Sequence, residues 1–272
     1  MALSPLDAAD HAHTRCDAYV VGCVVGRDRR GEVAAVSEWV SATSCGQVSG
    51  RRTDRISERD LEVLEFVARF GVVPRRVISF WAGTGRAVTA AREKRLREAG
   101  LIEVWPGIGT SGRIVVCTRD GLRAVCREAL PVPRPSLASL VHASAAAYVA
   151  VQLEHDGQRV LSEREIVARE RSEGRRIYSA DHAGRFHRPD LIVLGDPPEA
   201  IEVELSDKSN RRLDEILRAW RRAIARKQFS RVRYFCSPRA LPHVERACNR
   251  TRFIVGISVE AVPITDGFAV VS

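Results

Sequence analysis

The sequence predicts an α/β fold with two domains, and three observations support this prediction. Residues 51–130 contain three helical patterns, then two short strand patterns and a further helix. Residues 131–272 instead alternate strand and helix patterns, which is typical of a mixed sheet with flanking helices. Between them, the segment LPVPRP at 130–135 is proline-rich and therefore stiff and extended. A length of 272 residues is enough for two domains of ordinary size.

Composition and charge favour a globular, basic protein. Hydrophobic residues make up 45% and charged residues 28%, a balance that excludes a disordered chain. The net charge is +9, and the excess is almost all arginine, since lysine occurs only at Lys94, Lys208 and Lys227. Basic domains of this kind often bind nucleic acid. A GC-rich genome would explain why arginine is used in place of lysine, but it would not explain the positive net charge.

The cysteines and the hydropathy pattern bear on the compartment. The seven cysteines are scattered, with no C-x-x-C pair and no zinc-ligand spacing. This pattern predicts reduced thiols in a cytoplasmic protein rather than a disulfide framework. No apolar run is long enough to span a membrane, and the N-terminus does not resemble a signal peptide. We therefore expect a cytoplasmic protein with no membrane partner.

Residues 1–50 do not predict a fold. The first residues are polar and rich in alanine, residues 19–25 favour a strand, and residues 42–50 resemble a linker of small residues. His11 and His13 are two apart, but nothing nearby completes a metal site, so we interpret both as solvated. We expect this N-terminal segment to be poorly ordered, or else to have a fold that the sequence does not assign.

Residues 51–130 carry clear helix signals. Ser57 is expected to cap a helix, with Asp60 at the capping-box position and Gly71 as the stop. A second helix is predicted to begin near Pro74, an allowed first-turn position for proline, and to end at Gly83. A third is predicted after Thr84 as far as residue 99, followed by strands at 101–105 and 114–117 and a helix capped by Thr118 that extends to residue 130.

Three helices followed by a strand, a glycine-rich loop and a return strand indicate a winged helix-turn-helix. The third helix would be the one that enters the major groove of double-stranded DNA. Two alternatives to DNA contact remain. The basic residues of the third helix could form a solvated face balanced by Glu93 and Glu98, or the winged helix could bind only proteins, as some do. The candidate DNA-binding residues are Arg86, Thr89, Arg92, Lys94 and Arg95 on the third helix and Arg113 at the tip of the wing.

The remaining segments predict an α/β domain over residues 131–272. A helix at 136–154 is apolar on most faces and therefore buried, with His142 expected to be structural rather than catalytic. A helix at 210–227 combines a buried apolar stripe with an arginine-rich face that could follow a nucleic acid backbone or be merely solvated. The other expected elements are strands at 159–161, 232–236 and 253–259 and a helix at 242–248.

Residues 187–208 predict an acidic hairpin. An apolar run at 191–194 is followed by the turn residues Gly-Asp-Pro-Pro and by the alternating strand Ile-Glu-Val-Glu-Leu at 201–205. Alternation places Glu202 and Glu204 on one face, and hairpin pairing would bring Asp190 close to them. Clustered carboxylates repel one another unless a cation lies among them, and such oxygen ligands suit Mg²⁺ or Mn²⁺. The alternative is an amphipathic edge hairpin whose exposed face is acidic.

This hairpin resembles the PD-(D/E)XK nuclease-like superfamily, with Pro189-Asp190 as the PD and Glu202-Val203-Glu204 as the triplet. The resemblance implies that Asp190 and Glu202 hold a metal while a lysine activates water and steadies the phosphate. Glu204 stands where that lysine is expected, and Lys208 lies where it could reach back in its place. Glu163 is the candidate for a further site carboxylate, with Glu165 in reserve; the alternative is a favourable charge at a helix N-terminus.

Both halves together resemble the replication-relaxation family of plasmids and integrated mobile elements, over about residues 55 to 260. The resemblance implies a DNA-binding protein that supports replication or DNA relaxation, with other replication or transfer proteins as partners. The alternative is a Mg²⁺-dependent endonuclease or nickase that uses Asp190, Glu202 and Lys208. A pure protein-interaction module is the weakest hypothesis, because it would not explain the positive net charge. The sequence does not decide whether the protein forms a homodimer. The segments that carry the resemblance are Thr118-Arg-Asp-Gly-Leu, Ser162-Glu-Arg-Glu, Pro189-Asp190, Ile201-Glu-Val-Glu-Leu-Ser-Asp-Lys-Ser, Ile216-Leu-Arg-Ala-Trp and Tyr234-Phe-Cys.

Overall fold

The chain divides into two compact units, residues 1–48 and 49–272. In the first unit the described residues form one antiparallel ladder of β1 (Val25–Arg27) and β2 (Val33–Ala35). The other expectations for this segment, including most of the strand at 19–25 and the linker at 42–50, lie outside the described residues. The computed structural model describes residues 25–27, 33–35, 56–107, 112–134, 136–182, 184–206, 208–251 and 259–263.

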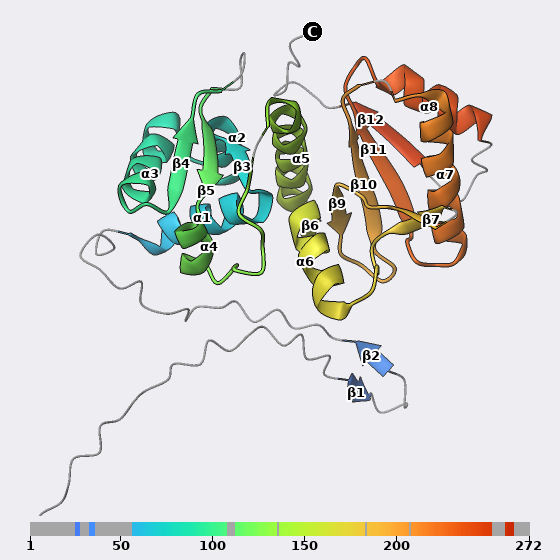
Figure 1. The fold of residues 1–272 in the computed structure, drawn as a ribbon, viewed down its shortest axis with the longest axis horizontal. Helices are drawn as coiled ribbons and strands as arrows, with labels where there is room; N and C mark the ends of the chain where they lie inside the picture. The colour runs from blue at the N-terminus through green and yellow to red at the C-terminus, as the bar shows by residue number, and fades with distance from the viewer. Residues whose placement is uncertain are drawn as a thin grey trace, which may run out of the picture. The chain divides into compact units, whose positions relative to one another are not determined.

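The first part of the second unit packs three helices against a three-stranded antiparallel sheet of order β3-β5-β4 (Figure 1). Ser57 and Asp60 form the predicted capping box at the start of α1. The last helix, α4, ends well before residue 130, because Cys126 adopts a left-handed φ of 52° that a helix cannot continue through. The elements are α1 (Glu58–Phe70), β3 (Val72–Pro74), α2 (Arg75–Trp81), α3 (Arg86–Glu98), β4 (Ile102–Trp105), β5 (Ile114–Cys117) and α4 (Arg119–Ala124).

The second part is a five-stranded mixed sheet of order β12-β11-β10-β9-β6. Strands β6, β9 and β10 are antiparallel neighbours, whereas β10, β11 and β12 run parallel. Helix α5 covers one face, and α7 and α8 cover the other (Figure 1). The elements are α5 (Leu137–His155), β6 (Val160–Ser162), α6 (Glu163–Glu173), β7 (Ala180–His182), β8 (Arg185–His187), β9 (Leu191–Val193), β10 (Glu199–Glu204), α7 (Asn210–Ala225), β11 (Arg231–Cys236), α8 (Leu241–Arg250) and β12 (Val259–Pro263).

Most predicted elements of this part are confirmed within a few residues, and the mixed α/β class is correct. The last strand is an exception. It was expected at 253–259, whereas β12 covers Val259–Pro263 and pairs in parallel with β11. Residues 252–258 lie outside the described part of the chain. The short strand β3 was not predicted, because three residues ending in a proline give no alternation to detect.

One hydrophobic core joins the two parts across the proline-rich connector. Phe66 of α1, Val77 of α2, Val149 of α5 and Ile201 of β10 belong to the same buried cluster. Ser162 and Arg164, at the start of α6, donate hydrogen bonds to backbone carbonyls near the end of α1. The predicted boundary near residue 130 is therefore not a division between independent cores.

Two further expectations concern thiols and membranes. Cys117, Cys236 and Cys248 are free thiols as expected, whereas Cys126 is disulfide-bonded. Burial raises the pKa of Cys117 and Cys236 to about 12, so neither is a reactive thiolate at neutral pH. Within the described ranges, no helix combines the length and the apolar character needed to cross a bilayer.

Candidate functional site

The predicted acidic hairpin is present, and it draws Asp190 to the carboxylates of β10. Strands β9 and β10 pair antiparallel with Leu191 opposite Ile201. The backbone N–H of Asp190 donates to the carbonyl of Ile201 at 3.0 Å, and the Asp190 Oδ2 accepts from the N–H of Val203 at 2.7 Å. The pairing thus extends past the end of β9 and fixes the Asp190 carboxylate against the edge of β10.

Glu202 and Glu204 lie on one face of β10, as alternation predicts, and they face the α7 side of the sheet. Ile201 and Val203 face the opposite side and join the core under α5. Both glutamates are buried, with only 3% and 4% of their surfaces exposed. The alternative of an exposed acidic face is therefore wrong. Buried carboxylates are costly unless a charge or hydrogen bonds compensate them.

Glu202 is compensated by two donors. The Nε2 atom of His187 lies 2.6 Å from Glu202 Oε1, and the indole Nε1 of Trp220 donates to the same oxygen at 3.2 Å. Burial lowers the pKa of His187, but the charge and the hydrogen bond of Glu202 outweigh it and raise the pKa above its ordinary value. The contact with Glu202 therefore favours the protonated form of His187.

Glu204 is compensated by Lys208. The Lys208 Nζ lies 2.5 Å from Glu204 Oε2, so the lysine does reach back toward the strand. Burial lowers the pKa of Lys208, but the carboxylates of Glu202 and Glu204 more than offset this and raise it. Lys208 is therefore a charged counterion of the cluster.

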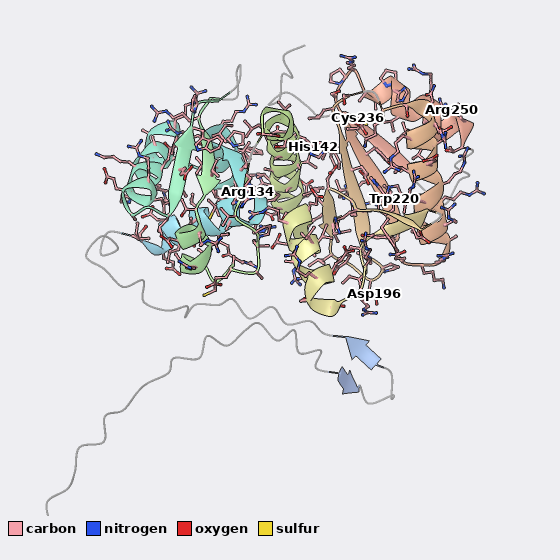
Figure 2. All side chains as sticks on the ribbon, in the orientation of Figure 1. Arg134, His142, Asp196, Trp220, Cys236 and Arg250 are labelled. Carbon is pink, nitrogen blue, oxygen red and sulfur yellow. The ribbon has the colours of Figure 1, made fainter. Side chains whose placement is uncertain are left out.

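Asp190 has a partner that the sequence did not indicate. The His142 Nε2 lies 3.4 Å from Asp190 Oδ2 and 3.1 Å from the carbonyl oxygen of Val203. The hydrogen bond to Asp190 raises the pKa of His142 to about 9. The expectation that His142 is structural rather than catalytic stays a prediction. Its partner Asp190 follows it by about fifty positions and reaches it because α5 crosses the sheet there. Figure 2 shows His142 on α5 and Trp220 on α7, on opposite sides of the sheet.

The two glutamates at the start of α6 differ in role. Glu163 is exposed as a whole, but partial desolvation and the nearby charge of Asp190 raise its pKa, which places it electrostatically at the cluster. Glu165 is buried and directed elsewhere, since it closes a capping box with Ser162 and pairs with Arg69 at 3.3 Å. Of the two candidates, only Glu163 lies near Asp190.

These side chains do not form a coordination sphere for Mg²⁺ or Mn²⁺. Among the residues with described side chains, no group of three His, Cys, Asp or Glu side chains is arranged to hold a metal ion. Instead, protein cations compensate the carboxylates: His142 beside Asp190, His187 on Glu202 and Lys208 on Glu204. A metal would have to displace these partners, so the cluster fits an internally neutralised network better than a metal site.

The predicted DNA-contact residues of α3 divide into two groups. Arg86 and Lys94 are exposed as expected. Thr89 is instead 2% exposed and bonded to Ser79 at 2.9 Å, which contradicts its placement on the DNA-facing surface. Arg95 is also engaged internally, in a bidentate pair with the fully buried Asp60 at 2.7 and 3.0 Å.

Two further residues of this set are partly engaged. Arg92 donates to the carbonyl of Arg59 at 3.0 Å. Arg113 is 59% exposed at its side chain and lies 3.8 Å from Glu93, while the wing residues 108–111 lie outside the described residues. Glu93 can occupy a buried position of α3 because the guanidinium of Arg75 donates to both carboxylate oxygens of Glu93.

Comparison with known proteins adds no family: no family model matches the chain, and neither does any curated protein or solved structure.

Proposed function

We propose that this protein binds double-stranded DNA through α3, acting as the recognition helix of a winged helix. The observation that carries the proposal is the exposed face of α3 that holds Arg86, Lys94 and Arg97, which helical spacing places within about a quarter turn of one another. Cations supply phosphate contacts, and arginine and lysine also contact guanine in the major groove. The packing of α1, α2 and α3 against the antiparallel sheet β3-β5-β4 supports this reading.

Two of the candidate DNA-binding residues are not proposed as DNA contacts. Thr89 and Arg95 are held within the protein, so we assign them to the fold rather than to the interface. By resemblance to the replication-relaxation family, the DNA would belong to a plasmid or an integrated mobile element, where the protein supports replication or relaxation. The nuclease-like part would then be a scaffold that offers additional binding surface.

A duplex-binding assay tests the proposal directly. Replacing both Arg86 and Lys94 with Ala is expected to weaken duplex binding about tenfold or more, because each good base contact contributes about 1–3 kcal/mol. Where the contacts are to phosphates, the slope of log K against log salt should fall by about 0.9 for each one. Fluorescence anisotropy with a labelled duplex measures both quantities. Arg119→Ala/Arg123→Ala, which removes two exposed arginines of α4, is the charge-matched control, and equal losses in both variants would contradict the assignment of α3.

The second candidate is a metal-dependent nickase, favoured by the gathering of Asp190, Glu202, Glu204 and Lys208 around the inner strand β10. Their internal pairing argues against it. We therefore expect supercoiled plasmid to remain intact with Mg²⁺ or Mn²⁺, and Asp190→Ala to bind DNA as the parent does. Nicking that requires metal, is abolished by EDTA and is lost in Asp190→Ala would contradict this and establish an endonuclease.

A further inference from the structure

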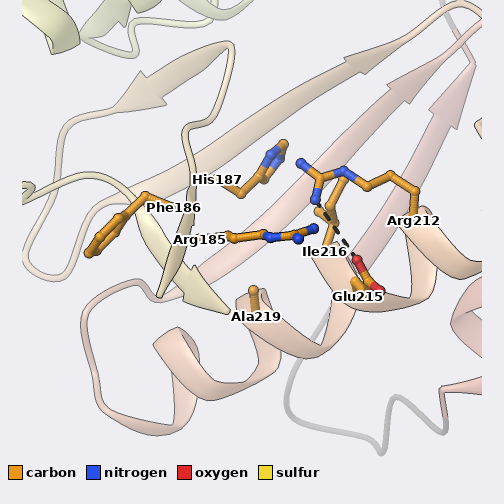
Figure 3. Close-up of a pocket in the computed structure, with 7 residues that line it drawn as sticks. All are labelled: Arg185, Phe186, His187, Arg212, Glu215, Ile216 and Ala219. Atoms are coloured by element: carbon orange, nitrogen blue, oxygen red, sulfur yellow. Dashed lines mark ion pairs between the residues drawn. The ribbon is translucent and has the colours of Figure 1, made fainter. Parts of the chain in front are cut away.

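A small pocket between the β7–β8 hairpin and α7 concentrates positive charge next to the acidic cluster. Arg185 and His187 of β8 line one side, and Arg212 and Glu215 of α7 line the other (Figure 3). Figure 3 shows Arg185 and Arg212 extending into the same region, while Phe186 points away from it. Two guanidinium groups directed to one place repel each other unless an anion lies between them.

The carboxylate in the pocket neutralises only part of this charge. Glu215 pairs more closely with Arg211, at 3.1 Å, than with Arg212, at 4.0 Å. Arg185 is exposed, and its side chain has neither an ion pair nor a hydrogen bond within the described part of the chain. The pocket therefore has more cationic donors than internal acceptors.

The start of α7 reinforces the same preference. A helix N-terminus carries a partial positive charge, and acidic side chains are normally favoured there. The first turn of α7 has no acidic residue and instead carries Arg211 and Arg212. Cations at the positive end of a 16-residue helix are unfavourable unless an external anion joins them.

We propose that this pocket binds a phosphodiester group of a DNA strand, held by Arg185 and Arg212. Guanidinium groups match phosphate oxygens in geometry and charge. His187 connects the pocket to the acidic cluster, because the same side chain lines the pocket and holds Glu202 at 2.6 Å. A strand anchored here would pass beside Asp190, Glu202 and Lys208. The inference rests on the proposed function for the identity of the anion.

The test compares two charge-matched double variants of the full chain. Arg185→Ala/Arg212→Ala removes the pocket arginines, and Arg218→Ala/Arg221→Ala removes two exposed arginines of α7 that do not line the pocket. In anisotropy titrations with a labelled duplex, the pocket variant should lose about 0.9 from the slope of log K against log salt, as expected for one phosphate contact, and the control should keep the parental slope. A pocket variant with the parental slope, or a control with an equal loss, would overturn the proposal.

A second measurement separates this inference from the proposed function. Inorganic phosphate should raise the Tm of the parent and of the control, and should raise that of the pocket variant less. If the parent binds no duplex but phosphate stabilises it through the pocket, the proposed function fails and the anion site stands. If duplex binding depends on Arg86 and Lys94 while the pocket variant behaves as the parent in both assays, the anion site fails and the proposed function stands.

Discussion

Replacing Arg69 with Ala is expected to lower the free energy of unfolding by about 3–5 kcal/mol, because it leaves the buried Glu165 and the partly buried Glu154 without their closest cation. Arg69 lies at the end of α1, where its side chain is largely buried. Its Nη1 atom is 2.8 Å from Glu154 of α5, and its Nε atom is 3.3 Å from Glu165 of α6. Its Nη2 atom donates to the carbonyl of Val160 at 2.7 Å. One guanidinium thus ties together elements from both sides of the proline-rich connector.

The electrostatics of Arg69 support a large effect. Burial alone lowers the pKa of the guanidinium, but the charges of Glu165 and Glu154 outweigh it and raise the pKa. The same two charges would be left unfavourably buried in the variant. Urea denaturation of parent and variant, followed by circular dichroism, measures the difference in the free energy of unfolding.

Two controls define what the Arg69 result means. Arg59→Ala removes a solvent-exposed arginine of α1 whose only ion pair among the described residues is with Glu62, and it should change the free energy of unfolding by less than about 0.5 kcal/mol. Adding Glu154→Gln and Glu165→Gln to Arg69→Ala should recover part of the loss, because the unpaired charges are then removed. If Arg69→Ala costs no more than Arg59→Ala, the two parts of the unit do not depend on this contact.

The sequence predicted well those features that depend on neighbours in the chain. Ser57 and Thr118 cap helices because each hydroxyl needs only an N–H three residues later. The buried stripe of α7 follows from helical periodicity alone, and Leu213, Ile216 and Trp220 are all buried. The turn between β9 and β10 follows from its glycine and prolines.

Features that depend on distant pairing could not be predicted in this way. Thr89 and Glu93 are buried although they are polar, because Ser79 and Arg75 from the preceding helix satisfy them. His142 joins the acidic cluster only because α5 crosses the sheet at Val203. His187 lies three residues before Asp190, but nothing in the local sequence shows that it faces Glu202. A polar residue on a helix gives the same sequence signal whether its partner is water or a buried charge.

Replacing Trp220 separates packing from hydrogen bonding at the acidic cluster. Trp220 is fully buried on α7, with its ring 5.2 Å from that of Phe229 and 5.6 Å from that of His187. Trp220→Ala should lower the free energy of unfolding by about 3–5 kcal/mol, because it leaves a large cavity. Trp220→Phe retains most of the packing and removes the N–H that donates to Glu202, so it should cost about 1–3 kcal/mol.

The comparison with Glu202→Leu identifies the source of the smaller loss. Leucine has a similar volume, but it neither accepts from the indole of Trp220 nor pairs with His187. If the hydrogen bond to Trp220 contributes, the loss in the double variant Trp220→Phe/Glu202→Leu should differ from the sum of the single losses by at least about 0.5 kcal/mol. Additive losses in urea denaturation would mean that Trp220 stabilises the sheet through packing alone.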